Sequence, residues 1–263
     1  MKRGTVMLKV KRILAVLSLL SLPALSSAGD RHFIYNYESA VLDAGEREIE
    51  TYTTFRFGRD KFYSAMDQSL EFEVGLGGDT QTSLYLNFTQ EFSDQGSGAQ
   101  LSGGPVLDGI SNEWKFRLSD SSADLVGLGL YFEPEFEPDD FELETKVIID
   151  KKIGSFLGTF NFLAAPAYSY VTNTSSILLR PSLGMGLFAT ERLFIGFESQ
   201  DENFYDDQPM RSVFSLGPLV EYSGKDWWVA ATYLPQIANI GNGSLDFTDS
   251  QRNQVRVATS FSL

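Results

Sequence analysis

The chain has 263 residues, of which 43% are hydrophobic, with no cysteine, a single histidine and a formal charge of −14. Such acidity excludes a nucleic-acid-binding protein, which needs a basic surface to displace counterions. The lack of cysteine excludes thiol catalysis, Cys-ligated zinc and disulfides, and one histidine leaves no second imidazole for a multi-His metal site.

The first 28 residues are predicted to be a cleavable signal peptide. They hold five basic and no acidic residues, followed by an apolar run over 13–25 and the small residues Ser26 and Ala28 at the expected cleavage site. The alternative is a permanent N-terminal anchor, but this run is shorter than the roughly 20 residues that a spanning helix needs. Without the signal peptide the formal charge of the chain becomes −19, from 16 basic and 35 acidic residues.

Residues 29–46 form a separate N-terminal segment whose placement the sequence leaves open. The segment is long enough to enter the lumen of the barrel that the following strands are predicted to form, as a plug, or to lie at the periplasmic rim as a latch. The aromatic residues Phe33, Tyr35 and Tyr37 argue against an entirely disordered tail. The histidine, His32, also falls here and is expected to be flexible and inert.

Residues 47–263 alternate between apolar and polar side chains, which is the pattern of β-strands. In 69–76, for example, Leu70, Phe72 and Val74 share one face, while Glu71 and Glu73 share the other. Twelve such segments are predicted, and they start near residues 47, 68, 80, 109, 124, 140, 155, 176, 192, 210, 226 and 252. The fold class is therefore all-β.

The connections predict how these strands are arranged. Links after the second, fourth, sixth, eighth and tenth strands are short, and most others are longer and rich in Gly, Asp, Asn and Ser. Short turns at one rim and long loops at the other are typical of a closed, antiparallel, up-and-down transmembrane β-barrel, here of about 12 strands. The alternative is a soluble exported β-sandwich or solenoid, in which the apolar stripe would pack inward.

A barrel of this kind predicts a location in the bacterial outer membrane, with its lipid and the barrel-assembly machinery as partners. The chain ends on an alternating strand that resembles the terminal signal read by this machinery, although it closes on Leu263 rather than phenylalanine. Prolines 134, 166, 181 and 235 are expected near the long-loop rim, where strands end. Pro218 lies deeper and suggests a β-bulge.

No catalytic, cofactor-binding or metal-binding motif is found, so an enzyme is not expected. The Gly-rich stretch 96–104 contains no phosphate-binding motif and is predicted to be an exposed loop. Acidic residues make the predicted long loops negative, either as solvated charge or as a site for a divalent cation between loops. They are Asp60, Asp67, Asp94, Asp108, Asp201, Glu202, Asp206 and Asp207.

If the apolar stripe faces lipid, the polar stripe lines the lumen. The predicted lumen-lining residues are Glu71, Glu73, Glu113, Lys115, Arg117, Glu133, Glu142, Glu144 and Arg180. Their excess of glutamate favours a narrow channel for small cationic or neutral polar molecules. The alternative is a non-conducting structural or interaction barrel, filled by its own charges, that presents acidic loops outside. Trp114, Trp227, Trp228 and Tyr233 are interpreted as anchors at the membrane interface.

Several short stretches, in order along nearly all of residues 29–263, resemble a known group of proteins. They are 46–58, 83–87, 110–117 (ISNEWKFR), 130–134 (LYFEP), and 216–218 (LGP) with Trp227 and Trp228. The resemblance is to uncharacterised proteobacterial outer-membrane β-barrels, in the neighbourhood of the outer-membrane transporters named for a MetA-pathway of phenol degradation. It implies an outer-membrane location and passage of small molecules, and it carries no catalytic or binding residues.

Overall fold

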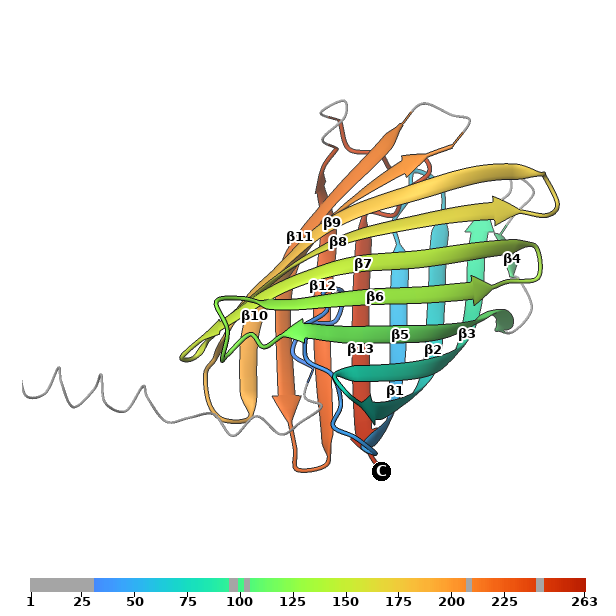
Figure 1. Cartoon of the computed structure of the whole chain (residues 1–263). Coiled ribbons are helices and arrows are strands. Elements are labelled where there is room, and N and C mark those ends of the chain that lie inside the picture. The colour runs from blue at the N-terminus through green and yellow to red at the C-terminus, as the bar shows by residue number, and fades with distance from the viewer. Residues whose placement is uncertain (1–30, 95–98, 102–104, 207–209, 240–243) are drawn as a thin grey trace, which may run out of the picture.

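The structure is a computed structural model that describes residues 31–94, 99–101, 105–206, 210–239 and 244–263 (Figure 1). The predicted signal peptide, most of the Gly-rich stretch and Asp207 lie outside these residues. Among the described residues, no helix is long and apolar enough to cross a membrane.

The described elements are all strands, and their bounds follow the alternation closely. They are β1 (Arg47–Phe57), β2 (Tyr63–Gly77), β3 (Thr80–Asp94), β4 (Ala99–Leu101), β5 (Val106–Ser119), β6 (Gly127–Phe136), β7 (Asp140–Ile153), β8 (Phe156–Ser169), β9 (Thr174–Phe188), β10 (Leu193–Tyr205), β11 (Arg211–Ser223), β12 (Trp227–Ala238) and β13 (Asn253–Ser262). Each of the 12 predicted segments corresponds to one long strand. The additional strand, β4, has three residues and pairs with the end of β3.

The strands form a closed antiparallel barrel, which confirms the predicted fold class. Each long strand pairs with its neighbours along the chain, and β1 pairs with β13 from Glu48↔Ser262 to Phe57↔Asn253 to close the sheet. Closure leaves no long edge unpaired, which is the condition for a sheet that spans lipid. Figure 1 shows that the strands are strongly tilted, so that strands on opposite sides of the barrel cross in this view.

The two faces of the wall differ in chemistry. Large apolar side chains such as Phe72, Trp114 and Phe197 point outward and remain about 40% exposed, whereas Glu71 and Glu113 point inward and are fully buried. This inside-out distribution is the reverse of a soluble β-sandwich, in which the apolar face would be covered. The apolar outer surface is therefore the face that suits lipid.

The contrast between loops and turns is smaller than predicted. The connection 137–139 at the long-loop rim is short, as predicted for that link, but 170–173 is as short as the turns at the other rim, and several strands extend beyond their predicted ends. Asp67, Asp108, Asp201 and Glu202 consequently lie on strands, and so does Asp94 at the end of β3. Polar pairing explains the extension, since Arg56 and Asp67 on adjacent strands form an ion pair at 2.6 Å.

The prolines follow the predicted placement in part. Pro134, Pro166 and Pro235 lie in the halves of their strands nearer the long-loop rim, but Pro181 lies at the middle of β9. At Pro218 the β11–β12 ladder is interrupted between Ser215↔Gln236 and Leu219↔Thr232, because proline offers no N–H. The register shift itself falls at residues 214 and 215, so the predicted bulge is displaced from the proline.

Candidate functional site

The N-terminal segment, residues 31–46, enters the barrel and fills part of its lumen. Figure 1 shows this segment, in blue, passing inside the wall. Phe33, Ile34 and Asn36 are at most 1% exposed. Of the two placements that the sequence left open, the structure shows the plug.

A single wall residue, Glu198 on β10, holds the tip of this plug. Its Oε1 accepts hydrogen bonds from the backbone N–H groups of Ile34 (3.0 Å), Tyr35 (2.8 Å) and Asn36 (2.9 Å), and from the Asn36 side chain (3.2 Å). A carboxylate that gathers consecutive N–H groups satisfies buried donors which would otherwise lose their water, and charge strengthens each bond. Glu198 therefore fixes the backbone of the plug to the wall.

Other polar wall residues hold the plug further along. The Tyr37 N–H donates to Asn161 Oδ1 (2.6 Å), and the Tyr37 carbonyl accepts from Asn161 Nδ2 (3.0 Å) and from Thr159 (2.7 Å). The Leu42 N–H donates to Gln81 Oε1 at 3.0 Å. The main chain of the plug is thus bonded to strands on several sides of the lumen.

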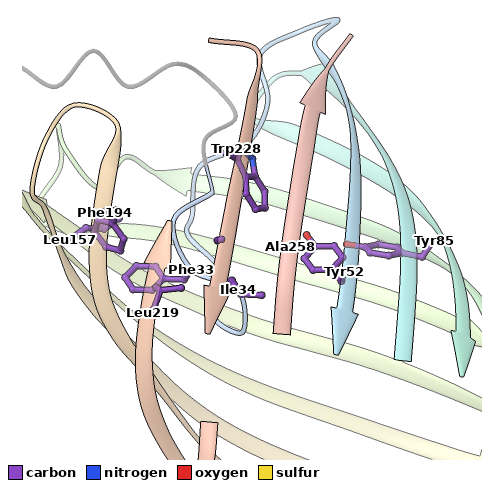
Figure 2. Packing of buried hydrophobic residues seen from close by; sticks show 10 residues of the cluster. Phe33, Ile34, Tyr52, Tyr85, Leu157, Phe194, Leu219, Trp228 and Ala258 are labelled. Carbon is purple, nitrogen blue, oxygen red and sulfur yellow. The ribbon is translucent and has the colours of Figure 1, made fainter. Parts of the chain in front are cut away.

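An apolar cluster supports these bonds, and Figure 2 shows it around Phe33 and Ile34. The ring of Phe33 meets that of Phe194 edge to face, with centroids 5.3 Å apart. Gly184 on β9 makes room for it, since a Cβ there would lie 2.6 Å from the Phe33 ring. Trp228 belongs to the same cluster and is 2% exposed. Its interpretation as an interfacial anchor is therefore wrong.

His32 is neither flexible nor exposed, contrary to the sequence-based expectation. It is buried against Phe188 and Phe194, and its Nδ1 lies 3.1 Å from Glu38 Oε2. Burial alone would raise the pKa of Glu38, but the attraction and hydrogen bonds of His32 outweigh it and lower that pKa below its usual value. The pair joins the two ends of the stretch 32–38 within the plug, which is a structural role.

All nine residues predicted to line the lumen lie on the inward face of the wall, but they belong to different regions. Glu71, Glu73, Glu113 and Lys115 are buried beside the plug. Glu133, Glu142, Glu144 and Arg180 lie on the long-loop side, where Glu144 forms ion pairs with Lys146 and with Arg180. Arg117 lies at the short-turn rim, where it bonds to Asp79, and its side chain is partly exposed.

On the long-loop side of the plug the lumen opens into a charged vestibule. Two adjoining cavities of about 300 Å³ each form it, and they share Tyr35, Thr54, Asp67, Arg180 and Arg256 in their walls. One cavity is lined by many carboxylates and the other by many guanidinium groups. The first cavity is lined by Asp67, Asp108, Glu133, Glu135, Glu137 and Glu144, with Arg31, Lys146, Arg180 and Arg256 among them. The second is lined by Arg56, Arg59, Arg180, Arg211 and Arg256, with Asp67, Glu202 and Asp249 among them.

The charge of the acidic half responds to pH near neutrality. Partial burial and the neighbouring carboxylates of Glu135 and Asp108 raise the pKa of Glu137, in the loop after β6, to about 7. Glu137 thus gains its negative charge as the pH rises through 7, and the acidic half is more negative at pH 8 than at pH 6.

A third cavity lies on the short-turn side of the plug. It has a volume of about 250 Å³ and is lined by the plug residues Arg31 and Glu38 and by the wall residues Glu50, Glu73 and Lys115, among others. The plug therefore separates polar space on both of its sides.

Sequence reasoning missed the residues that hold the plug. Glu198, Asn161 and Gln81 carry no motif, and each is one polar residue of an alternating strand like many others. The one usable signal was the aromatic content of residues 33–37, which indicates a buried segment without naming its partners.

Solved structures share this architecture. The COG4313 outer membrane channel from Pseudomonas putida F1 matches with a TM-score of 0.58 and 9% identity, over 88% of this chain and 100% of that chain. The NanC porin matches with a TM-score of 0.56 and 9% identity over 82% and 100%, and the KdgM porin with 0.52 and 9% over 82% and 99%. At such low identity the likeness shows the fold alone, which is a porin-like 12-stranded barrel.

The sequence itself matches the family described as "Family of unknown function (DUF6662)" over residues 25–152 and 140–263, so the chain belongs to that family. A comparison with curated proteins found no match. The finer resemblance, to transporters of a MetA-pathway, stays a prediction.

Proposed function

We propose that this protein is a channel of the bacterial outer membrane which admits small cationic or neutral polar molecules and which its own N-terminal segment closes. The observation that carries the proposal is the polar vestibule, two cavities of about 300 Å³ each, that ends at the plug. A barrel that served only as a scaffold would have no need of open, charged space on one side of a separate segment. The similarity in fold to the COG4313 channel and to two porins supports the same class of function.

The proposed preference for cations rests on the inward charges. Beside the plug, five carboxylates (Glu48, Glu50, Glu71, Glu73 and Glu113) face three cations (Arg31, Lys115 and Lys146). Carboxylates also outnumber cations, six to four, in the cavity of the vestibule that Glu133 and Glu137 line. Carboxylates in a narrow lumen raise the local cation concentration and repel anions. The arginine-lined half opposite them would orient a polar solute rather than exclude it.

The placement in the membrane is part of the proposal. Three features favour an outer-membrane protein that the barrel-assembly machinery inserts. The outer face of the barrel is apolar, the first and last strands begin and end at the short-turn rim, and a signal peptide is predicted. This placement is tested by fractionation of the expressed protein, which should be recovered with outer membranes and should show heat-modifiable mobility on gels. Recovery in the soluble periplasm would contradict it.

The second candidate is the non-conducting structural or interaction barrel. The plug favours it, because Phe33, Ile34 and Asn36 are fully buried, and Ile34 and Asn36 are hydrogen-bonded to the wall, as in a permanent core. The two candidates differ in one respect: a channel must conduct once the segment is removed, whereas a filled scaffold need not.

Ion selectivity tests the proposed function. In a variant that lacks residues 31–42, measured in a KCl gradient at pH 8 where Glu137 is ionised, the reversal potential should have the sign of cation preference. Replacing Glu133 and Glu142 by glutamine should move it towards zero, because both side chains face the lumen. Anion preference, or a potential that the double variant leaves unchanged, would contradict the proposal.

A further inference from the structure

Five glutamates gather on the inner face of β1, β2 and β5, beside the plug. We call them the glutamate cluster: Glu48, Glu50, Glu71, Glu73 and Glu113. Pairing between β1 and β2 sets Glu48 directly opposite Glu73, and Glu50 directly opposite Glu71. Like charges directly opposite each other on adjacent strands destabilise a sheet, so two such pairs side by side require a compensating positive charge.

The carboxylates converge closely enough to share a ligand. Two overlapping triads have one carboxylate oxygen per residue within 4.8 Å of one another, Glu48–Glu50–Glu73 and Glu71–Glu73–Glu113. Oxygens bound to one Ca²⁺ at about 2.3–2.6 Å can lie up to roughly 5 Å apart, so each triad fits the coordination sphere of a single ion. Glu73 belongs to both triads and lies at the centre of the cluster.

Hydrogen bonds from neighbouring side chains orient most of these carboxylates. Tyr85 donates to Glu113 (2.7 Å), Gln81 donates to Glu73 (3.1 Å), and Ser260 donates to Glu48 (2.7 Å). The second oxygens of Glu113 and Glu48 accept longer bonds from Gln81 (3.4 Å) and Ser262 (3.2 Å). Outer bonds of this kind fix the direction of metal-binding groups.

Glu71 is the exception and gives the second, independent observation. Its side chain is 0% exposed, and no donor group among the described residues bonds to either carboxylate oxygen. The neighbour within hydrogen-bond reach is the carboxylate of Glu73, which is itself an acceptor unless the two share a proton. A buried carboxylate loses its hydration, and if no donor or cation compensates for this loss, the desolvation costs several kcal/mol. Because Glu71 points at Glu73 and Glu113, the missing partner belongs between them.

Protein cations supply only part of the compensation. Arg31 lies 3.9 Å from Glu50, and Lys115 lies two residues from Glu113 on the same face of β5. Lys146 also acts on Glu113, although it forms an ion pair with Glu144 as well. Three positive side chains thus face five carboxylates. We propose that the glutamate cluster binds a hard divalent cation, with Ca²⁺ as the ion that its oxygen ligands and spacing suit, and that this ion joins β1, β2 and β5 beside the plug.

The ion has a route to this site. The cavity of about 250 Å³ on the short-turn side of the plug is lined by Glu50 and Glu73, which places two ligands at an accessible surface. Since a bound ion stabilises the folded state by mass action, binding also appears as a rise in Tm. The site does not depend on conduction, so its test is independent of the test of the channel.

The test uses the full chain in detergent, stripped with EDTA and titrated with Ca²⁺ by calorimetry and thermal unfolding. Tb³⁺ serves as a luminescent substitute, excited through Tyr52 and Tyr85, which bond to members of the cluster. Glu71→Gln should weaken Ca²⁺ binding by about tenfold or more, and Glu73→Gln should abolish it. The matched control is Glu221→Gln, a buried inward glutamate on β11 outside the cluster, which should bind as wild type does.

The glutamine variants should also be more stable than wild type in EDTA, because each relieves repulsion between like charges. Absence of Ca²⁺ and Tb³⁺ binding by the wild-type protein would overturn the proposal. So would binding that Glu71→Gln and Glu73→Gln leave intact, since the ion would then lie elsewhere. If a glutamine variant of the cluster were less stable than wild type in EDTA, this would also contradict the proposal, which requires the carboxylates to repel one another when no cation is bound.

Discussion

At the scale of single residues, the plug depends on one carboxylate more than on any other group. Glu198 Oε1 meets three consecutive backbone N–H groups and a side-chain amide, all at 2.8–3.2 Å. Its partners Ile34, Tyr35 and Asn36 are buried, so water cannot replace the acceptor if it is lost. An unsatisfied buried donor costs about 1–3 kcal/mol.

Glu198→Ala should therefore release the N-terminal segment, weakening its docking by about 2–3 kcal/mol. Glu198→Gln keeps an acceptor oxygen and should have a smaller effect. Limited proteolysis of the folded protein in detergent provides the measurement, with cleavage within residues 31–42 as the readout. Glu221→Ala is the control, as it removes a buried inward glutamate whose described hydrogen bond comes from Ser223 of the wall. Equal protection of Glu198→Ala and wild type would show that the apolar contacts alone hold the segment.

At the scale of elements, the alternation of side chains was enough to predict every long strand. Alternation with a period of two residues indicates a strand and also tells which face each side chain is on. For that reason Glu71 and Glu113 could be assigned to the inner face. The same rule exposes the error at Trp227 and Trp228. Two adjacent residues of one strand must face opposite sides, so only Trp227 can reach lipid.

The plug could not be predicted in the same way. Its contacts are long-range, as Ile34 and Glu198 are 164 residues apart in sequence, and no periodic pattern encodes them. The ends of the strands were also misjudged, because polar residues such as Asp67 and Asp201 continue the ladder through side-chain bonds. The glutamate cluster escaped notice because it depends on the register between β1 and β2, which the sequence does not give.

The outward face of the strands makes a prediction for lipid. Phe72, 43% exposed on β2, should tolerate arginine poorly, since a charge on the lipid-facing surface costs about 2–4 kcal/mol near the bilayer midplane. Phe62, 58% exposed in the loop before β2, is the matched control, and Phe62→Arg should change stability by less than about 1 kcal/mol. Reversible urea unfolding in lipid vesicles measures both. Similar costs for the two variants would argue against a lipid-facing wall.

At the scale of the whole molecule, the structure shows where the acidic residues of the chain lie. Part of the negative charge lies inside the barrel, in the glutamate cluster and in the carboxylate half of the vestibule, and the rest lies in the connections, as at Asp60, Asp120 and Asp246. The central claim is that residues 31–42 form the barrier between the vestibule and the cavity at the short-turn side.

Current through single molecules in a planar bilayer tests that claim most directly, with the full chain and the variant lacking residues 31–42 compared under the same salt. The full chain should remain closed for most of the time, and the deletion variant should show stable, open steps of current. Equal currents from the two proteins would mean that the segment is no barrier. A silent deletion variant that is folded and inserted would mean that wall side chains fill the lumen, and the barrel would then be a scaffold rather than a channel.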